Sequence, residues 1–158
     1  MKIGIIVYSQ TGNTFSVAQK ISQRLERAGH SAEVQRVRVR GDETPSRAGN
    51  IVLSSAPKVD GYDALILGAP VQAFSLVPVM TTYLGQLPSL EGTPVACFVT
   101  KQLPFNWTGG NRAVGRMKRL CESKGADVRA TEIVIWYQSR RAESIRRCVD
   151  RLGSLFAI

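Results

Sequence analysis

The chain has 158 residues, 44% of them hydrophobic and 21% charged, which is an ordinary globular composition. This length predicts a single domain over residues 1–158 with a proper hydrophobic core. The longest apolar runs, IGIIV and IVIWY, are too short to cross a bilayer, and the N-terminus does not resemble a signal peptide. We therefore expect a cytoplasmic protein that has no membrane partner.

The charge balance is strongly basic, with 21 Lys and Arg residues against 12 Asp and Glu residues and a net charge of +9. Many of the cations fall in the segments VQRVRVR, NRAVGRMKRL and SRRAESIRRCVDR. Such charge usually marks a solvated face, and its functional interpretation is attraction for acidic partners or nucleic acid. No nucleic-acid-binding motif and no aromatic-basic alternation accompanies it, so we do not expect nucleic acid as a partner.

The cysteines and the histidine indicate no metal site or catalytic triad. Cys97, Cys121 and Cys148 are widely spaced and form no CxxC pair, so we expect buried free thiols rather than disulfides or metal ligands. His30 is the only histidine, and its place in a predicted helix-to-strand turn suggests a surface position.

Strand-like and helix-like runs alternate along the chain. The predicted strands lie near 2–8, 32–38, 63–68, 94–100 and 128–136. The predicted helices lie near 13–28, 75–87, 110–124 and 140–156, and the stretch 40–60 is either a loop or a short helix. This alternation is typical of βαβ units. The predicted fold is therefore α/β, with a doubly wound, five-stranded parallel sheet between two layers of helices.

Ligands of such sheets bind at the carboxyl ends of the strands, next to the point where the strand order reverses. Three loops follow strands at that edge, at residues 9–14, 69–74 and 100–110. We expect the three loops to meet there and to form one site.

The first of these loops belongs to the segment YSQTGNT, at residues 8–14, which links an apolar strand to a helix-like pattern. A helix start has unpaired N–H groups and partial positive charge, so it can hold an anion. The alternative is that Thr11 or Asn13 only caps the helix, but one residue would suffice for that. The loop residues expected to surround a phosphate are Ser9, Gln10, Thr11, Gly12, Asn13 and Thr14.

The kind of phosphate compound follows from what the loop lacks. It has no Lys for a nucleoside triphosphate loop, no GxGxxG for a dinucleotide turn, and no Cys and Arg for a phosphatase loop. What remains is a terminal monophosphate that is held by neutral donors and a helix dipole.

The segment IIVYSQTGNTFSVAQKI resembles the phosphate loop of flavodoxins, with an aromatic residue, a hydroxyl-rich turn and then T-G-N-T. In one respect it differs, because typical flavodoxins have an extra residue between the Tyr and the Ser. The chain thus resembles a divergent, basic and short branch of flavodoxin-like proteins. The resemblance implies strand order 2-1-3-4-5 and flavin mononucleotide (FMN) as the cofactor.

The same resemblance implies that the second and third loops hold the isoalloxazine ring. Phe74 would cover one face of the ring, although it is equally suited to anchoring the following helix in the core. Phe105 or Trp107 would stack on the other face. The remaining residues implied in ring contacts are Pro70, Val71, Gln72, Ala73, Thr100, Lys101, Gln102, Gly109 and Gly110.

Two features separate this chain from the family. The second loop, Val71-Gln72-Ala73, has no glycine, whereas the family commonly uses one for a peptide that flips on flavin reduction; a flip should therefore cost more here. In addition, familiar flavodoxins are acidic, whereas this chain is basic, and the resemblance implies that Lys101 lies close to the ring. A nearby cation favours the reduced anionic flavin, so we expect a less negative potential.

Three functions remain open at this point. The first is an electron carrier that serves an acidic redox partner, such as a ferredoxin-like protein or a reductase. The second is an FMN oxidoreductase of the quinone reductase type that takes hydride from NAD(P)H, with Arg112 or Lys101 receiving its phosphates. The third is a flavin-free interaction protein. The sequence does not predict the oligomeric state.

Overall fold

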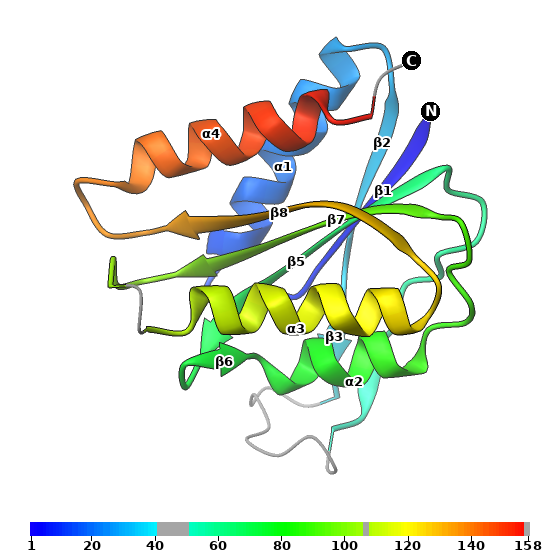
Figure 1. The fold of residues 1–158 in the computed structure, drawn as a ribbon, viewed down its shortest axis with the longest axis horizontal. Helices are drawn as coiled ribbons and strands as arrows, with labels where there is room; N and C mark the ends of the chain where they lie inside the picture. The colour runs from blue at the N-terminus through cyan, green and yellow to red at the C-terminus, as the bar shows by residue number, and fades with distance from the viewer. Residues whose placement is uncertain (41–50, 106–107, 157–158) are drawn as a thin grey trace.

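The computed structural model describes residues 1–40, 51–105 and 108–156, and it has the predicted α/β architecture. A central parallel sheet lies between two pairs of helices (Figure 1). Its main strands are β1 (Lys2–Val7), β2 (Ser31–Arg36), β5 (Ala64–Gln72), β7 (Pro94–Lys101) and β8 (Asp127–Ile135). The helices are α1 (Asn13–Arg27), α2 (Pro78–Gln86), α3 (Gly110–Ser123) and α4 (Arg141–Ser154).

The strand order is β2-β1-β5-β7-β8, and every neighbouring pair is parallel. This confirms the predicted order 2-1-3-4-5 for the five main strands. From β1 the chain goes to β2 on one side, and it later returns to place β5 on the other. The order therefore reverses at β1 and β5, and the carboxyl ends of these strands are where a doubly wound sheet binds ligands.

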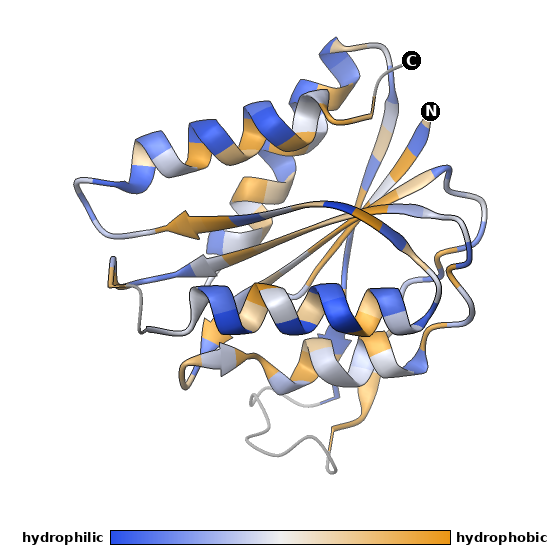
Figure 2. Cartoon of the chain, viewed as in Figure 1, coloured by the Kyte–Doolittle hydropathy of each residue, from blue (hydrophilic) through white to orange (hydrophobic). Residues whose placement is uncertain are grey.

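Each face of the sheet has its own core, because successive strand residues point to opposite faces. In β1, Ile3 and Ile5 lie in the core beneath α1 and α4, whereas Ile6 lies in the core beneath α2 and α3. Both cores are made mainly of buried aliphatic and aromatic side chains. Figure 2 shows hydrophobic residues along the strands and hydrophilic residues along the outer sides of α3 and α4.

The connection after β2 departs from the prediction in its described part. Two short antiparallel strands, β3 (Arg38–Val39) and β4 (Leu53–Ser55), pair with each other and form a second, small sheet. The expectation of a loop or short helix over 40–60 is therefore wrong for β4. The middle of that stretch, residues 41–50, lies outside the described residues.

The second predicted helix also begins later than expected. The strand β6 (Ser75–Leu76) turns back and pairs antiparallel with the end of β5, through Val71 with Leu76 and Gln72 with Ser75. The helix α2 starts only at Pro78, a residue that suits a first helical turn because its nitrogen has no hydrogen to leave unpaired. Sequence periodicity did not predict this two-residue hairpin arm.

Several single residues can be placed against their predictions. Cys97, Cys121 and Cys148 are buried and free, as expected. His30 was expected at the surface, but it is buried and its Nδ1 lies 3.3 Å from the N-terminal amine of Met1. No helix in the described part of the chain is both long and apolar enough to span a membrane.

Candidate functional site

The three predicted loops lie at the carboxyl ends of β1, β5 and β7, at one edge of the sheet, but β5 continues through residues 69–72 and β7 through Thr100 and Lys101, which were predicted as loop. A hydrogen bond joins the first loop to the third, because the buried hydroxyls of Thr14 and Thr100 lie 2.8 Å apart and either can donate to the other. The second and third loops also touch. A β-carbon at Gly109 would lie 2.3 Å from the carbonyl oxygen of Phe74, so only a glycine permits this approach.

The first loop ends in a helix start of unusual form. Gly12 stands at the N-cap of α1 in the left-handed conformation, with φ of +94°. The N-cap residue is a glycine and has no side chain to cap the helix, so neither Thr11 nor Asn13 is the N-cap. Instead, the buried Ser9 hydroxyl accepts hydrogen bonds from the N–H groups of Gly12 and Phe15, both at 3.2 Å. These N–H groups point at a single oxygen, as they would at an anion.

A cation supports the first loop from the neighbouring strand. Arg36 ends β2, its Nη2 donates to the carbonyl oxygen of Ser9 at 3.1 Å, and its guanidinium lies 4.6 Å from the centre of the Phe15 ring. The sequence reasoning considered only neutral donors and missed Arg36. The sequence did place Arg36 in a strand predicted next to the first one. In the structure Arg36 pairs with Val7, at the end of β1 from which the first loop starts.

The second loop is a tight hairpin turn between β5 and β6. Its two central residues, Ala73 and Phe74, have φ values of +50° and +61°, the conformation of a two-residue turn that usually contains glycine or asparagine. Positive φ thus occurs in this loop without a glycine. The Gly109 contact and the strand pairing on both sides hold the turn in this conformation. Phe74 is 54% exposed, so it does not anchor a helix in the core.

The third loop is organised by a buried lysine. The ammonium of Lys101 donates to the carbonyl oxygen of Phe105 at 2.7 Å and to the hydroxyl of Thr108 at 3.0 Å. Burial, and secondly the charge of Arg140, hold the pKa of Lys101 below its usual value. Sequence reasoning placed this cation beside a ligand, whereas the structure uses it first to fold the loop.

A hollow of about 230 Å³ opens between the second and third loops, and we call it the ring hollow. It is lined by Val71, Ala73, Phe74, Lys101, Gln102, Leu103 and Thr108. Phe74 and Phe105 are both about half exposed at this edge. The hollow is smaller than the roughly 300–1,000 Å³ of sites that enclose a ligand, so a flat ring placed here would stay partly open to solvent.

The remaining predicted residues occupy the same edge with different exposure. Gln10, Thr11 and Gln102 are exposed, Asn13, Pro70 and Val71 are partly buried, and Gly110 is buried. Gln72 is partly buried, and its Oε1 is a buried atom without a hydrogen-bond partner among the described residues. Trp107 lies outside the described residues.

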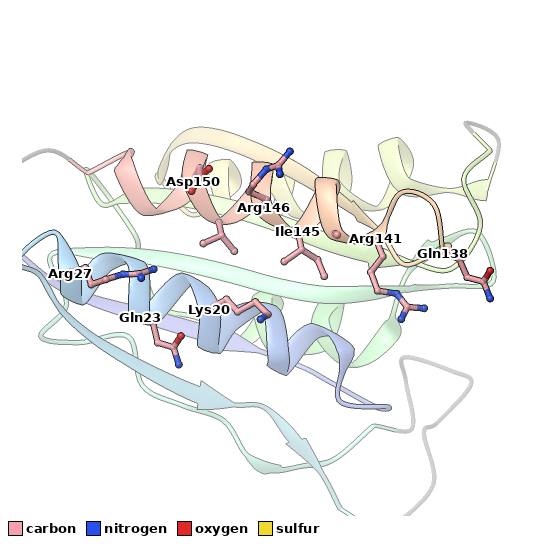
Figure 3. A pocket seen from close by; sticks show the side chains of 10 residues that line it. Lys20, Gln23, Arg27, Gln138, Arg141, Ile145, Arg146 and Asp150 are labelled. Carbon is pink, nitrogen blue, oxygen red and sulfur yellow. The ribbon is translucent and has the colours of Figure 1, made fainter.

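A larger hollow lies away from the three loops, between α1 and α4 (Figure 3). Its volume is about 590 Å³. The lining residues are Lys20, Gln23 and Arg27 of α1, and Gln138, Arg141, Ala142, Ile145, Arg146, Val149 and Asp150 of α4 and the turn before it. Four cations and one carboxylate thus surround an aliphatic floor. Arg141 is fixed by donating to the carbonyl oxygen of Trp136 at 2.9 Å.

No protein-family model and no curated protein sequence matches this chain. Solved structures do match it. Oxidised flavodoxin 2 from Bacillus cereus is 18% identical, with 99% of this chain and 100% of that chain covered and a TM-score of 0.71. Two-electron-reduced Megasphaera elsdenii flavodoxin is 21% identical, with 96% and 95% covered and a TM-score of 0.64.

A flavoprotein from Lactobacillus acidophilus NCFM, solved in complex with FMN, is 20% identical. The match covers 84% of this chain and 92% of the flavoprotein chain, with a TM-score of 0.62. These likenesses extend over most of the chain, and they agree with the α/β architecture of the fold. The chain therefore has the flavodoxin-like fold.

Proposed function

We propose that this chain binds FMN and transfers electrons. The observation that carries the proposal is the start of α1, where the N-cap is a glycine and the N–H groups of Gly12 and Phe15 converge on the Ser9 hydroxyl. A phosphate can take those N–H groups, and Arg36 adds positive charge nearby. The Thr14–Thr100 hydrogen bond joins this loop to the end of β7, where the next residue, Lys101, lines the ring hollow.

The residues present fit FMN in chemistry as well as position. The first loop offers hydroxyls, two side-chain amides and backbone N–H groups to the phosphate, and the ring hollow offers apolar walls with Phe74 on one side. Bound FMN supplies the redox chemistry, while the protein supplies position and electrostatics. Flavodoxins among the similar structures, and the flavoprotein with FMN, support this proposal. The partner that we propose is an acidic redox protein, because the chain carries a net charge of +9.

The test compares FMN with riboflavin, which lacks the phosphate. Quenching of flavin fluorescence on titration with the purified protein gives both dissociation constants. We expect FMN to bind at least about a hundredfold more tightly, because a phosphate held by several charge-assisted hydrogen bonds contributes about 3 kcal/mol or more.

The variant Thr11→Ala should weaken FMN binding and leave riboflavin binding unchanged, since Thr11 is exposed in the phosphate loop. The matched control is Ser31→Ala, which removes an exposed hydroxyl at the opposite edge of the sheet. Equal affinity for FMN and riboflavin, or no flavin binding at all, would contradict the proposal.

A second candidate function is reduction of a quinone-like acceptor by NAD(P)H through the same FMN. The observation that favours it is a second cavity beside the hairpin turn, which is lined by three arginines. Rapid mixing of the FMN-loaded protein with NADH and NADPH separates the two functions. Direct bleaching of the flavin within a second supports the enzyme, and an unchanged spectrum supports the carrier.

A further inference from the structure

The cavity beside the hairpin turn has a composition that the proposed FMN site does not use. It has a volume of about 390 Å³, and we call it the arginine hollow. Its lining residues are Ser75 and Leu76 of β6, Pro78 and Thr81 of α2, and Arg112, Arg116 and Arg119 of α3. No carboxylate belongs to this set, whereas the hollow between α1 and α4 contains Asp150.

The three arginines share one face of α3, because their spacing of four and three residues brings their side chains to the same side of a helix. All three are exposed, and none forms an ion pair or a hydrogen bond with a described residue. Like charges held this close on a helix disfavour folding by a few tenths of a kcal/mol per pair. A bound anion is one way in which such an arrangement is stabilised.

The other wall of the hollow is also suited to an anion. The hydroxyls of Ser75 and Thr81 can donate to phosphate oxygens, and the positive end of the α2 dipole lies at Pro78. The wall is fixed by the pairing of β6 with β5 and by the packing of α2 and β6 against α3. Hydrogen-bond donors on opposite sides of one cavity can bind, from both sides, a ligand that enters the cavity.

The length of the arginine row indicates how many phosphates the ligand has. From Arg112 to Arg119 the helix rises about 10 Å, since each residue adds about 1.5 Å. A single phosphate engages one or two guanidiniums, so a row of this length suits two phosphate groups. A hollow with hydroxyl donors fits a small molecule better than it fits the surface of an acidic protein.

The arginine hollow adjoins the ring hollow. Ser75 of the one directly follows Phe74 of the other, and the start of α3 touches the backbone of Phe74 at Gly109. We propose that Arg112, Arg116 and Arg119, with Ser75 and Thr81, bind a nucleotide that carries two or more phosphate groups. The proposal goes beyond FMN binding, because the row is separate from the phosphate loop at residues 9–14.

Isothermal titration of the purified protein with NADP⁺, ATP and AMP at fixed ionic strength tests the proposal. The variant is Arg116→Gln with Arg119→Gln. The matched control is Arg27→Gln with Arg146→Gln, which removes the same charge from the hollow between α1 and α4. We expect NADP⁺ or ATP to bind more tightly than AMP, with the dissociation constant raised about tenfold or more in the variant and less than about twofold in the control.

The outcome also identifies the source of the phosphates. Preference for NADP⁺ assigns the site to a hydride donor next to the ring, and preference for ATP assigns it to a nucleotide without redox chemistry; both support the proposal. No binding of either at about 1 mM, equal weakening in variant and control, or AMP binding as tightly as ATP overturns it. FMN affinity, measured on the same proteins, should not change in the variant, so failure here is distinguishable from failure of the FMN proposal.

Discussion

Ser9 shows how one side chain can hold a loop in readiness for a ligand. Its hydroxyl accepts the hydrogen bonds of Gly12 and Phe15, and its carbonyl oxygen accepts that of Arg36. The loop is therefore shaped before any anion arrives, and an arriving phosphate meets N–H groups that are already aligned. Binding then costs less ordering of the chain than it would in a mobile loop.

Replacing Ser9 with alanine should lower the free energy of unfolding of the flavin-free protein by about 1 kcal/mol, because the two N–H groups lose their acceptor. Urea unfolding measures this change, with Ser31→Ala as the control. In the presence of saturating FMN the loss should be smaller, since phosphate oxygens replace the hydroxyl. A loss that is unchanged by FMN would contradict the proposed position of the phosphate.

Lys101 gives a second prediction for a single residue. Its pKa is lowered first by burial and then by Arg140, so Arg140→Gln should raise the pKa while leaving it below the usual lysine value. Between the folded pKa and that of the unfolded chain, the unfolded state binds more protons, and this group makes the protein more stable as pH rises. The NMR signals of the lysine ε-methylene groups, followed against pH, measure the pKa of Lys101 in the original protein and in the Arg140→Gln variant. An unchanged titration in the variant would show that Arg140 does not act on Lys101.

At the scale of elements, the main strands and helices were predictable because each has a long local signal. Apolar runs mark β1, β5 and β7, and the 3.6-residue periodicity marks α1, α3 and α4. The short strands β3, β4 and β6 were not predicted. They have two or three residues each, and pairing with another segment stabilises them rather than their own composition.

The β5–β6 hairpin turn stores strain that a substitution can remove. Ala73 and Phe74 adopt positive φ, which costs a residue with a side chain about 1 kcal/mol. Replacing the pair with Asn-Gly, the preferred sequence of this turn, should raise the free energy of unfolding by about 1–2 kcal/mol.

Thermal or urea unfolding of the flavin-free protein measures the effect of the Asn-Gly pair. The control is Ala142→Gly, a helical position where the same kind of change should destabilise by about 1 kcal/mol. A destabilised Asn-Gly variant would show that the turn is held by side-chain contacts of Phe74 rather than strained by its backbone.

At the scale of the whole molecule, the edge of the sheet where the three loops meet could be predicted, and the contacts between the loops could not. The alternation of strands and helices placed the loops at 9–14, 69–74 and 100–110 on one edge, because the carboxyl ends of parallel strands lie at the same edge. The Arg36 contact, the Thr14–Thr100 pair and the inward bonds of Lys101 join residues far apart in the sequence or depend on the path of a loop. Local sequence patterns do not predict such contacts.

The net charge of +9 gives a prediction for the FMN-loaded protein as a whole. Its cations should stabilise a reduced, anionic flavin, and dissolved salt should screen them. The midpoint potential of the two-electron couple should therefore fall as ionic strength rises. The fall should be about 20 mV for each 1 kcal/mol of attraction that is lost. Anaerobic titration against reference dyes measures this slope. A potential that rises with salt would show that acidic groups control the field at the ring.

The hydrogen bond between Thr14 and Thr100 joins the segment proposed to hold the phosphate to the strand end beside the proposed ring site. An anion that orders the first turn of α1 also orders the end of β7 through this hydrogen bond. A flavin ring that binds afterwards therefore loses less conformational entropy of the protein. Inorganic phosphate and riboflavin, offered as separate molecules, should accordingly assist each other's binding by equal factors, and exchange of Thr14 for valine should make the two events independent.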